Sequence, residues 1–218
     1  MKKYFFNNSI IFILILLFGC SNNKQQEIKP AITLFDGNTF TGWEGNLDWF
    51  RIENGAIVAG SLEEEIPHNL FLCTIEEYGD FELKLEAKLI GKGDNAGVQF
   101  RSRRIPGETE VSGYQADMAG EGEDYSMIWG SLYDESRRNK MLVTGNEEEV
   151  LKIYKTQDWN EFVIRCTGKQ IQIWLNGYQT VNYIEEDSSI AKSGIIGLQI
   201  HGGAPAEAWY RNITLTEL

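Results

Sequence analysis

The chain has 218 residues, of which 42% are hydrophobic, and carries a formal net charge of −12. A length in this range fits one domain of ordinary size. The acidic balance argues against nucleic acid and anionic lipid headgroups as partners, because both repel a negatively charged surface. It places no restriction on a neutral partner such as a sugar.

The N-terminus has the pattern of a bacterial lipoprotein signal. Lys2 and Lys3 precede an apolar run at residues 10–18, which ends in Leu17-Phe18-Gly19-Cys20. A basic segment, a short apolar segment and a small residue before the cleavage point indicate secretion, and the run is too short for a comfortable membrane span. We therefore expect a signal peptide at 1–19, a lipid on Cys20, a polar tether at 20–30 and a single domain at 31–218. Ser21 after the cysteine favours the outer membrane of the cell envelope, facing either the periplasm or the outside.

Strand patterns dominate the rest of the chain. Residues 49–59 read as two short strands around a turn, and residues 80–90 alternate strictly between apolar and charged side chains. Residues 134–140 read as helical or irregular. Asn176-Gly177 predicts the turn of a hairpin at 169–184, with further strands at 161–167, 194–201 and 208–218. This density of short strands predicts an all-β fold, a two-sheet antiparallel jelly-roll sandwich of the concanavalin type. A barrel or propeller is less favoured because no repeat is visible.

Two cysteines remain after lipidation. Cys73 and Cys166 both lie in apolar, strand-like runs. We expect two separate buried thiols, with a disulfide as the alternative that an oxidising compartment allows.

Three predicted strands carry polar side chains that make directional hydrogen bonds. Residues 96–103, 113–118 and 195–201 alternate apolar with polar positions, so each polar set lies on one side of its strand. If the three strands share a sheet, one face gathers Gln99, Arg101, Gln115, Asp117, Gln199 and His201. Amide, guanidinium, carboxylate and imidazole groups suit the recognition of hydroxyls and carbonyls.

A second cluster follows in the charged segment 129–140. It contains Tyr133, Asp134, Glu135, Arg137 and Arg138. Exposed ion pairs contribute little stability, so a loop this charged is a candidate binding element. Trp129 and Trp209, with Tyr133, are candidates for stacking on sugar rings, whereas the other tryptophans are expected in the core or in hairpins: Trp43, Trp49, Trp159 and Trp174.

A series of short motifs resembles the 3-keto-disaccharide hydrolase family over nearly the whole predicted domain. In order they are LFDG (34–37), GW (42–43), EYGDFEL (77–83), NAGVQFR (95–101), GYQAD (113–117), GSLYDE (130–135), DWNE (158–161), WLNG (174–177), GIIGLQIH (194–201) and RNI (211–213). The resemblance implies a concanavalin-like jelly roll that cleaves glycosides already oxidised at C3. The ketone acidifies the C2 proton, so a base, a proton donor and a group that stabilises an enolate suffice.

The polar residues can be assigned to these roles as a hypothesis. His201 or Asp117 is the base, Glu135 is the acid, and Arg101 stabilises the enolate with Arg137 or Arg138 behind it. Gln99, Gln115 and Gln199 hold hydroxyls. Many relatives have Glu-Val-Gln after the tyrosine where this chain has Gln115-Ala116-Asp117, which leaves acid and base open. A divalent cation, Ca²⁺ through Asp117 and Glu135, is an open alternative.

Two other functions fit the same sequence. One is a non-catalytic carbohydrate-binding module that uses the same polar face without turnover. The other is a structural lipoprotein of the cell envelope that binds no small ligand. Release of sugar from 3-keto-glycosides, but not from unoxidised ones, separates the enzyme from both.

Overall fold

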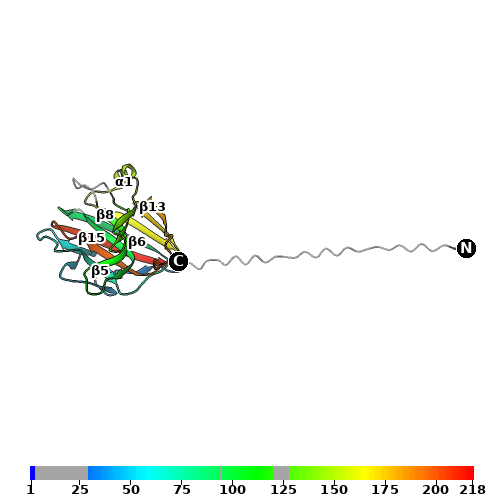
Figure 1. Cartoon of the computed structure of the whole chain (residues 1–218), viewed down its shortest axis with the longest axis horizontal. Coiled ribbons are helices and arrows are strands. Elements are labelled where there is room, and N and C mark those ends of the chain that lie inside the picture. Colours follow the sequence, from blue (N-terminus) through cyan, green and yellow to red (C-terminus); the bar gives the residue numbers. More distant parts are fainter. Residues whose placement is uncertain (3–28, 94, 120–127) are drawn as a thin grey trace.

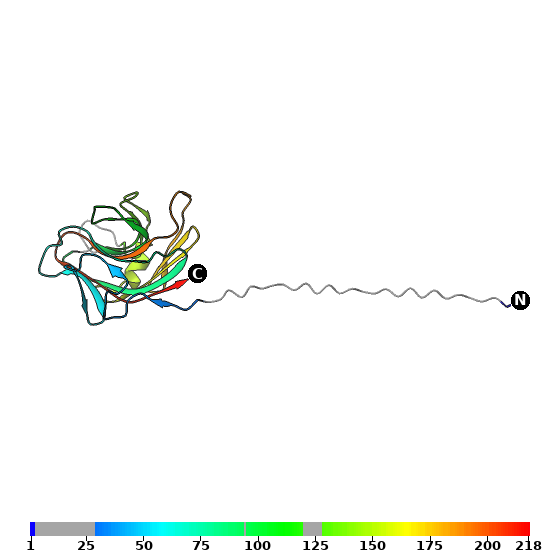
Figure 2. The same ribbon diagram turned by 90° about the horizontal axis from the view of Figure 1, so that it is seen from below.

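The computed structural model describes residues 1–2, 29–93, 95–119 and 128–218. The predicted signal peptide and Cys20 lie outside these residues, apart from Met1 and Lys2. Among the described residues, no helix is long and apolar enough to cross a membrane. The described residues from Ile32 onward form two antiparallel sheets that pack face to face, as the sequence predicts (Figures 1 and 2).

One layer is a sheet of eight strands in the described part of the chain. Its order is β13-β12-β11-β6-β15-β4-β3, and β1 pairs with β15. The strands are β1 (Ile32–Thr33), β3 (Phe50–Glu53), β4 (Ala56–Ser61), β6 (Phe81–Gly91), β11 (Asn160–Thr167), β12 (Gln170–Leu175), β13 (Tyr178–Ile184) and β15 (Ala206–Glu217). The turn at Asn54-Gly55 and the hairpin at Asn176-Gly177 are confirmed, and both asparagines adopt the positive φ that such turns require.

The other layer has seven strands among the described residues and carries the polar face. Its order is β10-β9-β8-β7-β14-β5-β2. The strands are β2 (Trp43–Glu44), β5 (Leu70–Thr74), β7 (Asn95–Arg104), β8 (Val111–Ala119), β9 (Leu132–Glu135), β10 (Lys140–Val143) and β14 (Ile195–Ile200). The three strands predicted to share a sheet, β7, β8 and β14, are direct neighbours.

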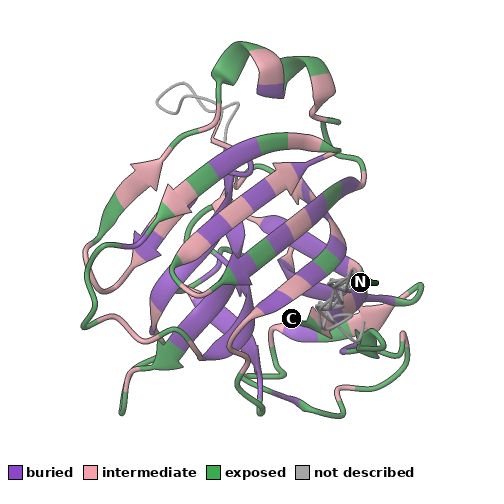
Figure 3. Ribbon diagram, turned by 90° about the vertical axis from the view of Figure 1, so that its right-hand side faces the viewer, coloured by how far each residue is buried: buried purple, intermediate pink, exposed green. Residues whose placement is uncertain are grey.

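The core lies between the two sheets and follows from the period of two. In β6, the side chains of Phe81, Leu83, Leu85, Ala87 and Leu89 all enter the core, while the alternate positions are less buried. Figure 3 shows the same alternation of buried and less buried positions along the strands. In the other sheet, Val98, Phe100 and Tyr114 are core residues. Burying these apolar side chains contributes about 1.5–3 kcal/mol for each large one. The polar positions of β7 and β8 must therefore face away from the core.

The segment after β9 follows the irregular rather than the helical alternative of the prediction. Residues 134–140 are not helical: Leu132–Glu135 and Lys140–Val143 are paired strands, and a turn joins them. The described helix, α1 (Glu147–Ile153), comes later, at one edge of the sandwich (Figures 1 and 3). Asn146 caps it by accepting a hydrogen bond from the Glu149 N–H. With Val150 as its one buried residue, it shows no helical periodicity in the sequence.

The two cysteines are free and buried. Cys166 belongs to the core between the sheets, whereas Cys73 packs with Phe71, Val111 and Ile195 in a separate small cluster. The expectation of two separate thiols is confirmed. Burial raises the pKa of both thiols to about 12, so neither is reactive at neutral pH.

Candidate active site

The seven-stranded sheet carries a pocket of about 240 Å³ on the face turned away from the core. We call it the carboxylate pocket; its walls are Asn95, Gln115, Asp117, Ile128, Tyr133, Glu135, Met141 and His201. Five of the predicted site residues meet here, from β8, β9 and the end of β14. The structure therefore brings Gln115, Asp117 and His201 of the predicted polar face together with Tyr133 and Glu135 of the second cluster.

The register of the strands explains this convergence. Gln115 lies opposite Gln99 on β7 and opposite Tyr133 on β9. Asp117 lies opposite Gly97, which has no side chain to fill the space. His201 follows the last residue of β14, and the backbone N–H of His201 donates to the backbone carbonyl of Asn95 over 3.2 Å. Residues that are distant in sequence become neighbours because antiparallel pairing aligns alternate positions of adjacent strands.

Gly97 makes room for Gln115. A Cβ atom at position 97 would lie 2.5 Å from Cδ and 2.6 Å from Cγ of Gln115. Real Cβ contacts do not come so close, so the Gln115 side chain lies flat over the bare backbone of β7. The glycine in the NAGVQFR motif is thus a packing requirement of the site.

A line of hydrogen bonds runs beneath the pocket and ends on Asp117. Ser102 Oγ donates to Gln99 Oε1 over 3.1 Å, and Gln99 Nε2 donates to Gln115 Oε1. Gln115 Nε2 in turn donates to Asp117 Oδ1 over 3.3 Å. The Met118 backbone N–H, which can only donate, also reaches Asp117 Oδ1, over 3.0 Å. With Oδ1 held as an acceptor by two donors, a proton on this carboxyl resides on Oδ2.

Asp117 is set up to hold that proton near neutral pH. Burial raises the pKa of Asp117 to about 7, against a weaker opposite effect of the hydrogen bonds from Gln115 and Met118, and the Glu135 charge adds to the rise. Desolvation disfavours a buried carboxylate, which is the usual way a carboxyl becomes an acid–base group at physiological pH.

Glu135 is the second carboxyl of the pocket. Burial raises its pKa, the Glu110 carboxylate raises it further, and the nearby His201 imidazole opposes the rise. His201 and Glu135 both line the carboxylate pocket. Burial therefore raises the pKa of both carboxyls that line the pocket, Asp117 and Glu135.

His201 has one ring nitrogen committed and one free. Its Nδ1 lies 2.7 Å from the Gly202 carbonyl oxygen. A carbonyl can only accept, so Nδ1 carries a hydrogen, and in the neutral ring Nε2 keeps its lone pair. The exposed His201 side chain thus presents a base at the wall of the pocket.

Gln99 and Gln199 lie below the pocket rather than in its wall. Both are 0% exposed, and neither lines the carboxylate pocket. Gln99 positions Gln115, as described above. Gln199 has no hydrogen-bond partner for either amide atom among the described residues. The expectation that these two amides hold sugar hydroxyls is not met by their placement.

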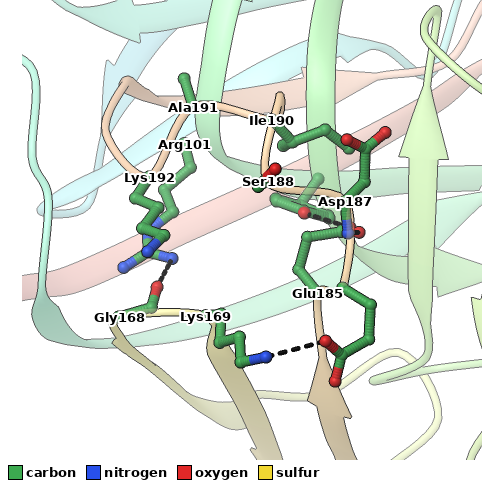
Figure 4. Close-up of a pocket in the computed structure, with 11 residues that line it drawn as sticks. Arg101, Gly168, Lys169, Glu185, Asp187, Ser188, Ile190, Ala191 and Lys192 are labelled. Atoms are coloured by element: carbon green, nitrogen blue, oxygen red, sulfur yellow. Dashed lines mark hydrogen bonds and ion pairs between the residues drawn. The ribbon is translucent and has the colours of Figure 1, made fainter.

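Arg101 lies elsewhere, which corrects its predicted position beside Asp117 and His201. A bulge shifts the β7–β8 register between Phe100 and Arg103, and Arg101 has φ +46°. The irregular residue breaks the alternation of two and turns the side chain away. Figure 4 shows Arg101 in another pocket, where it donates to the Gly168 carbonyl; it also donates to the Gly79 carbonyl and pairs with Asp80.

The remaining predicted binding residues are also engaged outside the carboxylate pocket. Arg137 pairs with Asp134 and covers the Tyr114 ring, and Arg138 bridges Asp134 and Glu185. Trp129 is 1% exposed and packs on Tyr154 and Phe162, so it cannot stack on a sugar. Trp209 belongs to the other sheet, where it meets Trp159 edge-on.

Asn95 is a site residue that the sequence analysis missed. It lines the pocket, and its Oδ1 is buried with no hydrogen-bond partner among the described residues. It stands two and four residues before Gly97 and Gln99, so the polar alternation of β7 already includes it. If the predicted strand had begun at Asn95 rather than at Ala96, the alternation would have placed Asn95 on the polar face.

The pocket does not assemble a metal site from the described residues. No group of three or more His, Cys, Asp or Glu side chains in the described segments lies close enough to hold a metal ion. Asp117 and Glu135 therefore have no third His, Cys, Asp or Glu beside them in the described segments for the calcium alternative.

Comparison with known proteins identifies the family. The model of the 3-keto-alpha-glucoside-1,2-lyase-like domain matches residues 30–216. The chain belongs to this family. Among curated relatives of this lyase-like domain, the 3-keto-disaccharide hydrolase of Bacteroides thetaiotaomicron is 25% identical over 235 residues, which is 86% of this chain and 78% of the relative.

Solved structures support the fold of this lyase-like domain. A candidate glycosyl hydrolase from Parabacteroides distasonis superimposes with a TM-score of 0.66 at 18% identity, covering 86% of this chain and 94% of the other. A Bacillus subtilis protein with a galectin-like fold gives a TM-score of 0.61 at 12% identity, with coverage of 86% and 94%. The jelly-roll prediction is therefore confirmed.

Proposed function

We propose that this protein cleaves 3-keto-glycosides by elimination followed by hydration. A base removes the proton on C2, which the C3 ketone acidifies. The electrons of the C2–H bond form a C1=C2 double bond as the C1–O bond breaks, and the leaving oxygen takes a proton. Water then adds its oxygen to C1 and a proton to C2, so the net reaction is hydrolysis.

One observation carries the proposal: a histidine with one uncommitted ring nitrogen and a buried carboxyl with a raised pKa line the same pocket. His201 Nε2 keeps its lone pair because Nδ1 is bound to the Gly202 carbonyl. Asp117 holds its proton on Oδ2 because two donors occupy Oδ1. In this assignment His201 takes the C2 proton and Asp117 gives its proton to the leaving oxygen. Glu135, beside His201, stabilises the imidazolium that forms.

The placement of Arg101 changes the account of the enolate. Since Arg101 is bound to Gly79, Gly168 and Asp80 in another pocket, it does not stabilise the charge on the C3 oxygen. The Tyr133 hydroxyl and the Asn95 amide line the carboxylate pocket and supply neutral donors instead. Preorganised donors of this kind stabilise a developing oxyanion without the cost of burying a second charge.

The test uses soluble protein lacking residues 1–20, incubated with 3-keto-disaccharides, methyl 3-keto-glucoside and the same sugars unoxidised. We expect product from the keto forms alone. His201→Ala and Asp117→Asn each lower kcat by on the order of 10²-fold or more, because each removes a proton-transfer group.

We call the pocket lined by Arg101, Gly168 and Lys192 in Figure 4 the Arg101 pocket. The matched control is Lys192→Met, at an exposed residue of that pocket, and it leaves kcat unchanged. Rates that survive both pocket substitutions would remove His201 and Asp117 from the mechanism. Tight binding of unoxidised glycan with no turnover of any keto form would favour the carbohydrate-binding module. No binding and no turnover would favour the structural lipoprotein.

We further propose that the protein acts at the cell envelope, anchored through lipid on Cys20. The support is the basic start, the apolar run and the Leu-Phe-Gly-Cys motif in the sequence. A lipid anchor followed by the polar segment 21–29 would hold the domain near the membrane and leave its pocket open to soluble sugars.

A further inference from the structure

A second hollow adjoins the carboxylate pocket. It measures about 180 Å³ and is formed by Lys92, Gly93 and residues 202–204. Asn95 and His201 belong to the walls of both hollows, so the two share a boundary. We call the second one the glycine-loop pocket.

The glycine-loop pocket is a fixed structure made largely of backbone. The Lys92 and Gly93 N–H groups both donate to the Pro205 carbonyl, and Gly203 forms a two-bond bridge with Ile66. A Cβ atom at Gly93 would lie 2.6 Å from the Ala204 oxygen, and one at Gly202 would lie 2.7 Å from the His68 Cα. At Gly93 and at Gly202 the neighbouring backbone approaches so closely that only glycine fits. The backbone that lines the hollow is therefore tightly packed.

The two hollows differ in chemistry. The carboxylate pocket contains Asp117 and Glu135, whereas among the described residues the glycine-loop pocket has the charged side chain of Lys92 beside the shared His201. Every acid–base group assigned above therefore lies in the first hollow or on the boundary. A ring that reacts must occupy the carboxylate pocket, and the glycine-loop pocket is left for a group that does not react.

Size points the same way. Small-molecule sites usually measure about 300–1,000 Å³. Neither hollow reaches that range alone, but the two together do. At their boundary, the buried Asn95 Oδ1 has no hydrogen-bond partner among the described residues. A buried acceptor left unpaired is unfavourable, so this atom favours a ligand that brings a hydroxyl to the junction.

We propose that the glycine-loop pocket binds the second sugar ring of a disaccharide, with the cleaved bond beside Asn95 and His201. This inference rests on the proposed function and deepens it. The oxidised ring occupies the carboxylate pocket, where its C2 proton meets His201. Lys92 and the Oδ1 atom of Asn95 bind hydroxyls of the leaving sugar, and this acceptor selects substrates that span both hollows.

The experiment compares a 3-keto-disaccharide with methyl 3-keto-glucoside. We expect the wild-type kcat/KM to be at least about 10-fold higher for the disaccharide, the usual scale for filling one extra subsite. Ala204→Phe, which adds bulk to the glycine-loop pocket, should cut that preference by on the order of 10-fold. Lys92→Met, at an exposed residue that leaves folding intact, should cut it several-fold.

Two matched controls line the Arg101 pocket instead: Ala191→Phe and Lys192→Met keep the wild-type preference. Equal kcat/KM for the two substrates, or equal losses on both in Ala204→Phe, would overturn the subsite. Calorimetry with the unoxidised disaccharide and methyl glucoside separates this failure from that of the proposed function. Tighter disaccharide binding that Ala204→Phe abolishes supports the subsite even if no keto sugar is turned over.

Discussion

Two hydrogen bonds decide where protons reside in the carboxylate pocket. The Gly202 carbonyl keeps a hydrogen on His201 Nδ1, and the Met118 N–H keeps one off Asp117 Oδ1. Both partners are backbone groups, whose donor or acceptor character cannot change. The free base and the free acid position are therefore built into the fold rather than left to side-chain rotation.

The raised pKa of Asp117 makes stability depend on pH. The folded protein keeps this proton up to about pH 7, whereas the unfolded chain releases it near the ordinary aspartate pKa of 3.8. The stabilising contribution is complete below that lower value and is lost as pH rises to about 7, at up to about 1.4 kcal/mol per pH unit. In urea titrations from pH 4 to 8, Asp117→Asn should show a weaker fall in the free energy of unfolding than the wild type. Identical slopes would contradict the shift.

Gln99 should influence Asp117 without touching substrate. In Gln99→Glu the new carboxylate accepts from Gln115, so the Gln115 amide turns and its donor to Asp117 is lost. A hydrogen bond to a charged group contributes about 1.5–3 kcal/mol, so the pKa of Asp117 rises by about one unit or more. Because Asp117 must be protonated to act, the basic limb of the kcat–pH profile moves to higher pH.

The neutral variant Gln99→Met provides the companion measurement. It also removes the donor to Gln115, but it adds no charge, so the shift should have the same sign and be smaller. Loss of activity with an unchanged pH profile in both variants would mean that Gln99 only supports the packing of β7 and β8.

At the scale of whole elements, the bulge in β7 divides the polar face into two regions. Before the bulge, the strand keeps the alternation of two. Asn95 therefore lines the carboxylate pocket, and Gln99 lies beneath it. Arg101, within the bulge, turns to join the 79–80 and 168 segments. The bulge thus separates Arg101, which connects strands and loops of the fold, from Asn95 and Gln99, which lie at or beneath the carboxylate pocket.

This division predicts that Arg101 contributes to stability rather than to catalysis. Arg101→Met removes three hydrogen-bonding contacts from a side chain that is nearly fully buried, and should lower the free energy of unfolding by on the order of 3 kcal/mol. Below the melting transition, kcat per folded molecule should stay within about 2-fold of wild type. Arg104→Met, which breaks the exposed pair with Glu44, should cost about 0–1 kcal/mol. A stable but inactive Arg101→Met protein would return Arg101 to the mechanism.

Hydrophobic alternation in the sequence predicts part of the fold and of the candidate site. Alternation over β6, β7, β8 and β14 is a direct consequence of burying one face, so the sandwich and the convergence of Asp117 and His201 could be predicted. The bulge at Arg101 has no such signature, because it depends on the pairing with β8. Helix α1 is too short to show a period. The buried state of Gln99 and Gln199 depends on packing around the sheet, which alternation alone does not reveal.

At the scale of the molecule, the pocket lies on the outer face of one sheet, and the predicted anchor precedes β1 of the other. The membrane proposal can be tested independently of activity. In cells fed a palmitate label, the wild type should carry the label and sediment with membranes. Cys20→Ser should lose the label and the processing, because the acylated residue is gone. Label retained in Cys20→Ser, or a wild type found only in the soluble fraction, would contradict lipidation.

The bare backbone at position 97 also links two positions on neighbouring strands. Since any side chain there would collide with Gln115, alanine at 97 becomes acceptable only together with a shorter residue at 115, such as serine. That exchange would also delete the donor to Asp117. Gly97 on β7 and Gln115 on β8 are therefore expected to change together, in evolution or in design. Any such paired substitution would also alter the hydrogen bonding of Asp117, the proposed acid of the pocket.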